Sequence, residues 1–481
     1  MSKLFNIWKQ RHLTIIGKNL LINSLSTSLF IFNAQIDIPP VDFIKLVEKQ
    51  HKEFLWGGTP KIAHHTIIAD YKQGGIKYKD ITSFLNSINV KFIHSLSSAS
   101  HSVLPNLWIK QLFKIPTNSI DQQQIYFEDY FSNKLNIIDC KFKLPRKVNW
   151  NGHPFYYEIL KTFEKVSGNM CKNADNILSM PIWFNHQLNT KFDEVISQAG
   201  FNFMKDLFPK NQLIIGNFNG LGNNKIRKLK TIIKKIPGVW RTTVEQSENI
   251  FITVNPVQTV NLNGCDVYIK NLESQVIYNW SISNKIRLPT GILRWCEEID
   301  LSDTDIKNGF FFARACTQSV FDQVFQYKIL TQILPTNYYL KRYLIKDSDI
   351  CSKCLIEKDT VLHNLWLCPC LVPYVTNVIK FLKNTCNVKD DIALVTYFFG
   401  FQNNVGLNHI LIELKKEIFY NWNINVSVNV FCERFLAKLR NIIIKEKKVM
   451  FKNDSYDLFY TKWINFRDIY DFLGPDFQII H

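Results

Sequence analysis

The feature that most constrains this chain is a group of three cysteines and one histidine within eighteen residues. Cys351, Cys354, His363 and Cys368 follow the pattern C-x2-C-x8-H-x4-C. Two cysteines three positions apart can bind one ion from a tight turn, and a His and a Cys five positions apart can reach it from one turn of helix or loop. Three thiolates and one imidazole complete a tetrahedral set, which predicts a structural Zn²⁺ with no open position for catalysis.

Two alternatives stay open at this motif. Cys370 follows Cys368 after a single proline and could replace it as the fourth ligand. The four side chains could instead be unrelated residues of a core, although two pairs at ligand spacing rarely coincide in so short a segment. The order Cys, Cys, His, Cys is that of a nucleic-acid-binding zinc knuckle, with a longer gap before the His than in the short retroviral form.

Charge and cysteine content indicate the kind of partner and compartment. The 481 residues include 58 Lys and Arg against 41 Asp and Glu, for a net charge of +17. This excess favours a polyanion, nucleic acid before membrane. No apolar run is long enough to span a bilayer, so no membrane association is expected. Eleven cysteines in irregular spacing and no signal-like start favour a reducing intracellular location, the nucleus and cytoplasm.

Hydrophobic periodicity predicts a mainly α, multidomain protein with minor β structure and one small zinc knuckle. Apolar residues recur at helical spacing in residues 1–35, 41–55, 81–96, 372–382, 409–420 and 431–450. β-branched residues between Ile250 and Lys270 predict a short strand pair. Helices are expected again from Gly309 onward. Residues 100–180 carry no sustained period, so we expect loops and short elements there.

Residues 225–236 predict an amphipathic basic helix. Ile226, Leu229 and Ile233 would face inward, while Lys228 and Lys230 belong to a charged flank. Such a flank is either a solvated face or a surface that contacts phosphates.

Several separated segments resemble the region that follows the polymerase palm in reverse transcriptases of non-LTR (LINE-type) retrotransposons. Residues 8–18 read W-x-x-R-x-L-T-x-x-G-K, residues 54–58 F-L-W-G-G and residues 74–80 G-G-I-x-x-x-D. Further on, residues 181–185 read P-I-W-F-N and residues 200–207 begin with Gly and end with Asp-Leu. The resemblance rests on the collinearity of these segments.

The same resemblance extends to the region of the cysteine motif. Residues 327–337 read Y-K-I-L-x-x-I-L-P-T-N, which is similar to the segment before the zinc-binding motif of that family. Residues 398–400, F-F-G, resemble a glycine segment further on. Residues 100–180 and 240–300 carry little of the likeness.

The residue patterns and the resemblance together predict five regions. These are a thumb-like helical region at 1–98, a connecting region with the basic helix at 99–245, a mixed α/β then helical region at 246–345, the zinc-binding knuckle at 346–376 and a C-terminal helical region at 377–481.

The resemblance also implies RNA and DNA as partners, held during target-primed reverse transcription, and no small-molecule substrate. Lys9, Arg11 and Lys18 would contact phosphates from the thumb-like region. The knuckle would present Lys353, Lys358 and Trp366 to the nucleic acid, although Trp366 could equally pack in the core. Lys341 and Arg342 would extend this basic surface; the full set of candidates is Lys9, Arg11, Lys18, Lys228, Lys230, Lys341, Arg342, Lys353 and Trp366.

We expect no polymerase activity from this chain. The aspartates that hold two Mg²⁺ in the family's palm have no counterpart here, because Asp390-Asp391 follows the zinc motif and lacks the preceding aromatic residue. The helical pattern is already under way at the first residues, so parent polymerase domains are expected upstream. The alternative interpretation is a structural or protein-interaction remnant of a retroelement, with a purely structural zinc site.

Overall fold

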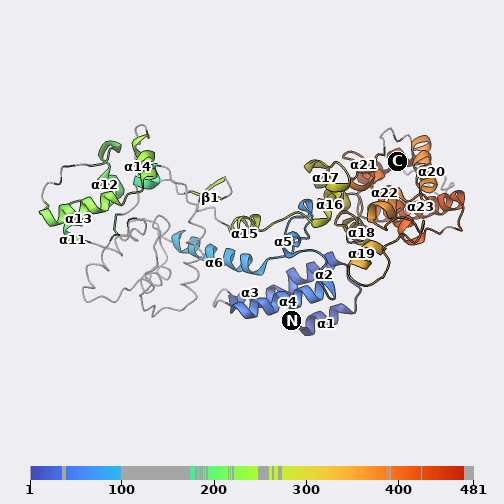
Figure 1. The fold of residues 1–481 in the computed structure, drawn as a ribbon, viewed down its shortest axis with the longest axis horizontal. Helices are drawn as coiled ribbons and strands as arrows, with labels where there is room; N and C mark the ends of the chain where they lie inside the picture. Colours follow the sequence, from blue (N-terminus) through green and yellow to red (C-terminus); the bar gives the residue numbers. More distant parts are fainter. Residues whose placement is uncertain are drawn as a thin grey trace. The chain divides into compact units, whose positions relative to one another are not determined.

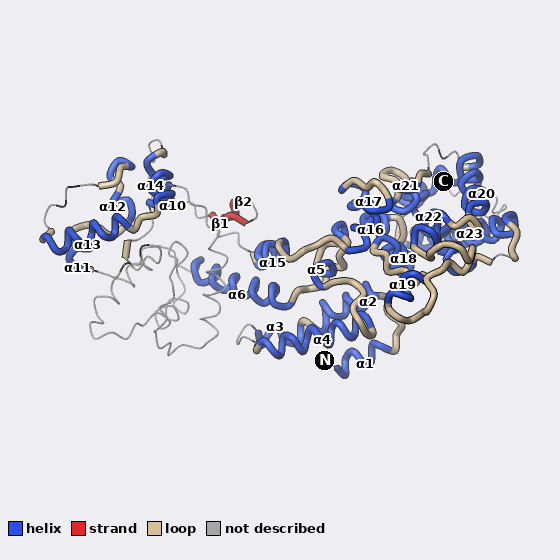
Figure 2. The backbone as a smooth tube through the Cα atoms, in the orientation of Figure 1, coloured by secondary structure: helices blue, strands red, loops and turns tan. Residues whose placement is uncertain are grey.

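The structure is a computed structural model. It describes residues 2–34, 39–98, 174–178, 182–183, 188, 190, 193–214, 216, 218, 221–247, 259–262, 265–268, 273–386, 388, 392–423 and 425–470. This part of the chain is mainly α-helical, as the sequence predicts, and its only strands are β1 (Thr259–Leu262) and β2 (Cys265–Tyr268) (Figure 2). No described helix combines the length and the apolar character needed to cross a membrane.

The chain folds into two compact units. Unit 1 comprises Met1–Ser26, Leu46–Lys79 and Lys285–His481, and unit 2 comprises Thr27–Lys45 and Asp80–Asn284. Helix α4 (Val41–Trp56) contributes residues to both units. This division joins the first and last segments of the sequence in one unit, and the five regions expected from the sequence remain a prediction.

The other helices of unit 1 come from both ends of the chain (Figure 1). They are α1 (Ser2–Lys9), α2 (Ile15–Leu21), the π-helical η1 (Ile22–Ser26), α5 (His64–Ile67), η2 (Tyr71–Gln73), α16 (Thr290–Glu298), α17 (Asp303–Ala315), α18 (Val320–Leu330), α19 (Asn337–Arg342), the π-helical η5 (His363–Leu367), α20 (Val372–Thr385), α21 (Leu394–Phe399), α22 (Val405–Asn421), α23 (Val428–Lys452), α24 (Tyr456–Trp463), η6 (Ile464–Phe466) and α25 (Arg467–Tyr470).

The turn at Gly74 joins the early and late segments of unit 1. Gly74 has φ +81°, a left-handed conformation that favours glycine. A Cβ on Gly74 would lie 2.9 Å from the Phe310 ring, and one on Gly75 would lie 2.0 Å from the carbonyl oxygen of Ala69. The Tyr327 hydroxyl donates to the Gly74 carbonyl oxygen at 3.0 Å. Gly74 is therefore required by close packing against α17, and Gly75 by its close contact with the Ala69 backbone.

Helices α17, α18, α21 and α22 pack against one another to form the centre of unit 1 (Figure 1). Trp295 is fully buried, with its ring centroid 4.7 Å from that of Phe398. Gly309 allows α17 to approach α21, because a Cβ there would lie 2.7 Å from the Phe399 ring. Helix α22 of this core also packs against η5, which carries part of the cysteine motif.

The remaining helices of unit 2 include a set between Ala174 and Glu245 that surrounds a separate core. They are α3 (Ser28–Ala34), α6 (Ile81–Ser98), α10 (Ala174–Leu178), α11 (Glu194–Gln198), α12 (Met204–Leu207), η3 (Pro209–Asn211), α13 (Asn223–Lys234), α14 (Gly238–Glu245) and α15 (Ser274–Ser283). Trp183, Leu229 and Trp240 are buried together in this core. Helix α15 packs against α6, where the Tyr278 hydroxyl accepts a hydrogen bond from the Asp80 backbone N–H at 3.1 Å.

Most helices expected from periodicity are confirmed, with boundaries shifted by a few residues. The expected strand pair is also present, and β1 and β2 are antiparallel with Thr259 opposite Tyr268. The expectation that helices return only at Gly309 is wrong, because α15, α16 and the start of α17 precede it. Pro289, which directly precedes α16, is a start signal that this expectation overlooked.

Candidate metal centre

The four side chains of the cysteine motif meet in unit 1. One ligand atom from each of Cys351, Cys354, His363 and Cys368 lies within 4.8 Å of all the others. The Sγ atoms of Cys351 and Cys368 are 4.0 Å apart, and the Sγ of Cys354 is 3.3 Å from Nε2 of His363. This gathering of three sulfurs and one imidazole nitrogen could hold a metal ion.

A tight turn brings the first two ligands together. The Cys351 backbone N–H donates to the Glu357 carbonyl at 2.8 Å, and an isolated antiparallel bridge pairs Ile350 with Lys358. Between them, Leu355 has φ +58° and its N–H donates to the Cys351 carbonyl at 2.9 Å. The turn therefore keeps both sulfurs on one side at the spacing that the sequence predicts.

A π-helical turn positions the other two ligands. In η5 the Cys368 backbone N–H donates to the carbonyl of His363, five residues earlier, at 2.9 Å. The wider turn differs from the i to i+4 pattern of an α-helix, and such turns occur often at functional sites. Both side chains are buried, so the two ligands come from a backbone segment that is packed rather than exposed.

Buried polar side chains brace the motif. Asp359, only 3% exposed, accepts from the Asn364 side-chain amide at 2.6 Å and from the Asn337 backbone N–H at 2.7 Å. The Asn337 amide in turn donates to the Ile350 carbonyl at 2.7 Å. Because each buried group has a partner, this network can fix the two halves of the motif against α19 at little desolvation cost.

The electrostatic setting favours a cation between the ligands. Burial raises the pKa of Cys351 and of Cys368. Burial also acts to raise the pKa of Cys354, but the backbone N–H groups of Glu357 and Ile356 stabilise its thiolate and lower the pKa overall. Thiolates so close together repel one another, and a bound dication offsets that repulsion.

The structure distinguishes between Cys368 and Cys370 by geometry. Cys368 belongs to the cluster, whereas the Cys370 thiol lies 3.5 Å from the carbonyl oxygen of Lys353 and outside the group of four. Cys370 is therefore the natural control for the ligand assignment.

The side chains of Lys353 and Trp366 both contact other residues of unit 1. The Lys353 ammonium donates to the Asn364 backbone and side-chain oxygens at 2.8 and 3.0 Å. Burial lowers the pKa of Lys353 to about 8. The Trp366 ring packs 4.5 Å from that of Tyr397. Of the two roles considered for Trp366, this contact fits core packing, and both residues act as braces of the motif in this arrangement.

The remaining candidate contact residues fall into paired and unpaired groups. Lys341 binds Asp349 at 2.9 Å, and Lys228 binds Asp193 at 2.6 Å beside Lys225. Burial acts to raise the pKa of Asp193, but the hydrogen bonds from these lysines lower it to about 2. These cations already have a carboxylate partner, so they have less charge to offer a phosphate.

Lys9, Arg11, Lys230 and Arg342 are exposed, and none forms an ion pair with a carboxylate in the described part of the chain. The Arg11 guanidinium lies over the Trp8 ring, 5.5 Å from its centroid. These four side chains keep their charge available at the surface.

Two further lysines, Lys61 and Lys328, complete a cationic cluster with Lys9 and Lys18. Helix α2, which carries Lys18, packs against α18, which carries Lys328. The pKa of Lys18 is lowered first by burial and then by the nearby charges of Lys61 and Lys9. The pKa of Lys328 is lowered first by burial and then by the charge of Lys61. Within the described residues, none of the four forms an ion pair with a carboxylate. Sequence reasoning missed Lys61 and Lys328 because neither lies in a visible basic run.

A second group that could hold a metal consists of Asp322, His409 and Glu413, all buried. The Lys416 ammonium already binds both carboxylates, and it lies 2.8 Å from Glu413. A lysine cation therefore neutralises this group, and we assign no metal to it.

Comparison with protein-family models and with curated proteins finds no match to this chain. Asp390 and Asp391, which we excluded as a catalytic pair, lie outside the described residues. So do parts of residues 181–185, although Trp183 is buried and donates to the Asn202 side chain at 3.3 Å.

Proposed function

We propose that Cys351, Cys354, His363 and Cys368 bind one structural Zn²⁺. The observation that carries this proposal is the convergence of the four ligand atoms within 4.8 Å. Three cysteines and one histidine are a common ligand set for structural zinc, and softer ligands of this kind disfavour Mg²⁺ and Ca²⁺. All four positions are filled by protein atoms, so the ion would hold the turn and η5 together rather than activate water.

We propose further that the chain is a nucleic-acid-binding region, similar to the C-terminal part of a LINE-type reverse transcriptase. In that role it would hold template RNA and target DNA during target-primed reverse transcription, while polymerase chemistry would reside in other domains. The order of the zinc ligands, the collinear segments and the cluster of Lys9, Lys18, Lys61 and Lys328 support this function. Lysines without carboxylate partners are the groups that phosphates can engage at least cost.

One alternative function is a structural or protein-interaction remnant of a retroelement. The inward orientation of Lys353 and Trp366 favours it, because both side chains serve the motif's own packing. In this alternative, zinc would still bind, but nucleic acid would bind weakly and without a defined surface.

Salt-titrated RNA binding distinguishes the two functions. The zinc-loaded chain is titrated against a labelled single-stranded RNA by fluorescence anisotropy between about 50 and 200 mM salt. If phosphate contacts carry binding, log K falls linearly with log salt, with a slope of about −0.7 per contact. We expect a slope equivalent to several contacts. A flat dependence, or no measurable binding, would contradict the nucleic-acid function and leave the structural alternative.

A further inference from the structure

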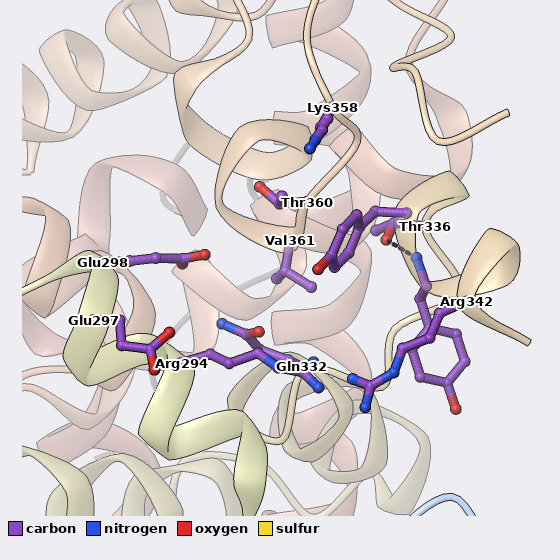
Figure 3. Close-up of a pocket in the computed structure, with 11 residues that line it drawn as sticks. Arg294, Glu297, Glu298, Gln332, Thr336, Arg342, Lys358, Thr360 and Val361 are labelled. Carbon is purple, nitrogen blue, oxygen red and sulfur yellow. Dashed lines mark hydrogen bonds between the residues drawn. The ribbon is translucent and has the colours of Figure 1, made fainter.

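A cavity of about 220 Å³ lies beside the candidate metal centre, within unit 1 (Figure 3). Three segments form its walls: α16 contributes Arg294, Glu297 and Glu298, α19 contributes Tyr338 and Arg342, and the loop between Cys354 and His363 contributes Lys358. The volume is below the roughly 300–1,000 Å³ of pockets for drug-sized ligands, so a single small group would fit.

The charged side chains around this cavity are not held in ion pairs, although the pKa of the nearby Asp349 carboxyl is lowered by its hydrogen bond from Lys341 and also by the charge of Lys358. Arg294, Glu297, Glu298, Arg342 and Lys358 make no hydrogen bond or ion pair through their side chains with the residues that the structure describes. Lys341, which lies beside Arg342 on α19, is by contrast paired with Asp349. Five unpaired charges around one cavity are therefore available to a ligand that carries both donors and acceptors.

The two acids lie apart from Arg342 and Lys358, whereas Arg294 shares helix α16 with the acids. Glu297 and Glu298 lie on one side of the cavity, Arg342 lies on the opposite side, and Lys358 lies between them at the edge (Figure 3). The pKa of Glu298 is raised first by partial burial and then by the neighbouring Glu297 carboxylate. N–H donors placed between the two carboxylates would therefore stabilise their charged forms. The opposite wall offers cations to an anionic group.

An unpaired guanine nucleotide matches this arrangement. The Watson–Crick edge of guanine presents adjacent N–H donors that a carboxylate can accept, and its O6 and N7 atoms accept from an arginine such as Arg294. Its phosphate would find Arg342 and Lys358. Unstacked bases of single strands are commonly held on aromatic rings and read along both edges, and Tyr338 offers a ring at this wall.

We propose that this cavity binds the base of one unpaired guanine nucleotide of a single strand, with Glu297 and Glu298 on the base and Arg342 and Lys358 on the adjoining phosphate. The inference rests on the proposed nucleic-acid function and adds base selection to it. The loop that carries Lys358 is tied at both ends to the metal ligands, so zinc binding would also shape this wall of the cavity.

Binding of two labelled RNA pentanucleotides, UUGUU and UUCUU, to the zinc-loaded full chain tests the proposal. We expect UUGUU to bind about tenfold more tightly, the discrimination that one good bidentate base contact provides. Glu298→Gln should remove most of this preference and leave UUCUU binding unchanged. Arg342→Ala should weaken both RNAs, and Lys341→Ala should weaken neither by more than about twofold, because Lys341 already binds Asp349.

The outcomes separate this inference from the function on which it rests. Equal affinity for UUGUU and UUCUU, with salt-dependent binding of longer RNA retained, would overturn the guanine site and leave the proposed function intact. A preference for UUGUU that persists in Glu298→Gln would also overturn it. Failure of every RNA to bind would overturn both. Arg342 is exposed and Glu298 is only partly covered at the cavity wall, so neither substitution should unfold the protein.

Discussion

The fourth ligand of the metal motif is decided by single atoms rather than by spacing. The sequence predicts Cys368 as the ligand and leaves Cys370 as an alternative; in the structure the Cys368 sulfur lies beside Cys351, at 4.0 Å. The Cys370 thiol instead approaches the Lys353 carbonyl. The Cys368 backbone N–H donates to the His363 carbonyl in a π-helical turn, a local geometry that periodicity alone does not reveal.

Replacing each cysteine by serine tests the assignment. We expect about one Zn²⁺ per wild-type chain and loss of that zinc in Cys351→Ser, Cys354→Ser and Cys368→Ser, because a serine hydroxyl does not replace a thiolate ligand. Elemental analysis of reduced protein measures zinc, and hydrogen exchange should show lost protection around the motif. Cys370→Ser is the matched control and should keep its zinc. The reverse pattern, with zinc lost only from Cys370→Ser, would reassign the ligand.

Residues that suggest function in the sequence often turn out to serve packing. Lys353, expected at a nucleic-acid surface, braces Asn364. Thr14 and Gly17, part of the first segment of the resemblance, form a helix N-cap in which the Gly17 N–H donates to the Thr14 hydroxyl at 3.2 Å. Sequence patterns identify such residues but do not distinguish a role in packing from a role in binding nucleic acid.

At the scale of elements, hydrophobic periodicity predicts the positions of helices, because a helix depends on residues close together along the chain. Helices α4, α6, α20 and α23 lie where apolar stripes place them, because each buries one face. Helix α22 is an exception to a simple stripe, since its buried face also includes Glu413 and Lys415. These charges are tolerated because tertiary partners surround them, for example the Tyr397 carbonyl that accepts from Lys415 at 2.9 Å.

The cavity and the cationic cluster could not be predicted in the same way. The walls of the cavity come from α16, α19 and the loop between Cys354 and His363, which are separated in sequence. The lysine cluster joins Lys18 to Lys328 only after α2 packs on α18. Both features depend on long-range packing, whereas the metal motif is local and therefore visible in the sequence.

His51 links three segments of unit 1 and should make the stability of this unit sensitive to acid. Its ring nitrogens lie 2.7 Å from the Ser26 hydroxyl and 2.9 Å from the Tyr78 hydroxyl. Burial lowers the pKa of His51 from 6.5 to about 4. Between these pH values the unfolded chain binds more protons, so the free energy of unfolding falls as the pH falls from 6.5 toward 4.

The His51 contribution is about 3 kcal/mol, present in full above pH 6.5 and lost progressively below it. Urea unfolding of wild type and His51→Gln at pH 7 and pH 4.5 measures it by difference. The variant should be less stable at pH 7 but should lose less stability on acidification. His12→Gln, at an exposed histidine, is the matched control for the loss of one imidazole. Parallel profiles for wild type and His51→Gln would refute the assignment.

At the scale of the whole molecule, the net charge of +17 overstates the charge that a phosphate can use. Lys77 binds Asp70 at 2.8 Å and Lys341 binds Asp349 at 2.9 Å, so their charges are largely satisfied. Lys61 and Lys328 have no such partner among the described residues and repel other lysines. Where unpaired cations gather, a polyanion gains most by binding.

Two double variants with the same change in net charge therefore should differ in RNA binding. Lys61→Ala with Lys328→Ala should make the slope of log K against log salt shallower by about 1.4, since each lost contact on a single strand contributes about 0.7. Lys77→Ala with Lys341→Ala should leave the slope nearly unchanged, because these lysines are paired with Asp70 and Asp349. Fluorescence anisotropy with one labelled RNA across a salt series measures both. Equal slopes in the two variants would mean that overall charge attracts the RNA, and that the lysine cluster is not its binding surface.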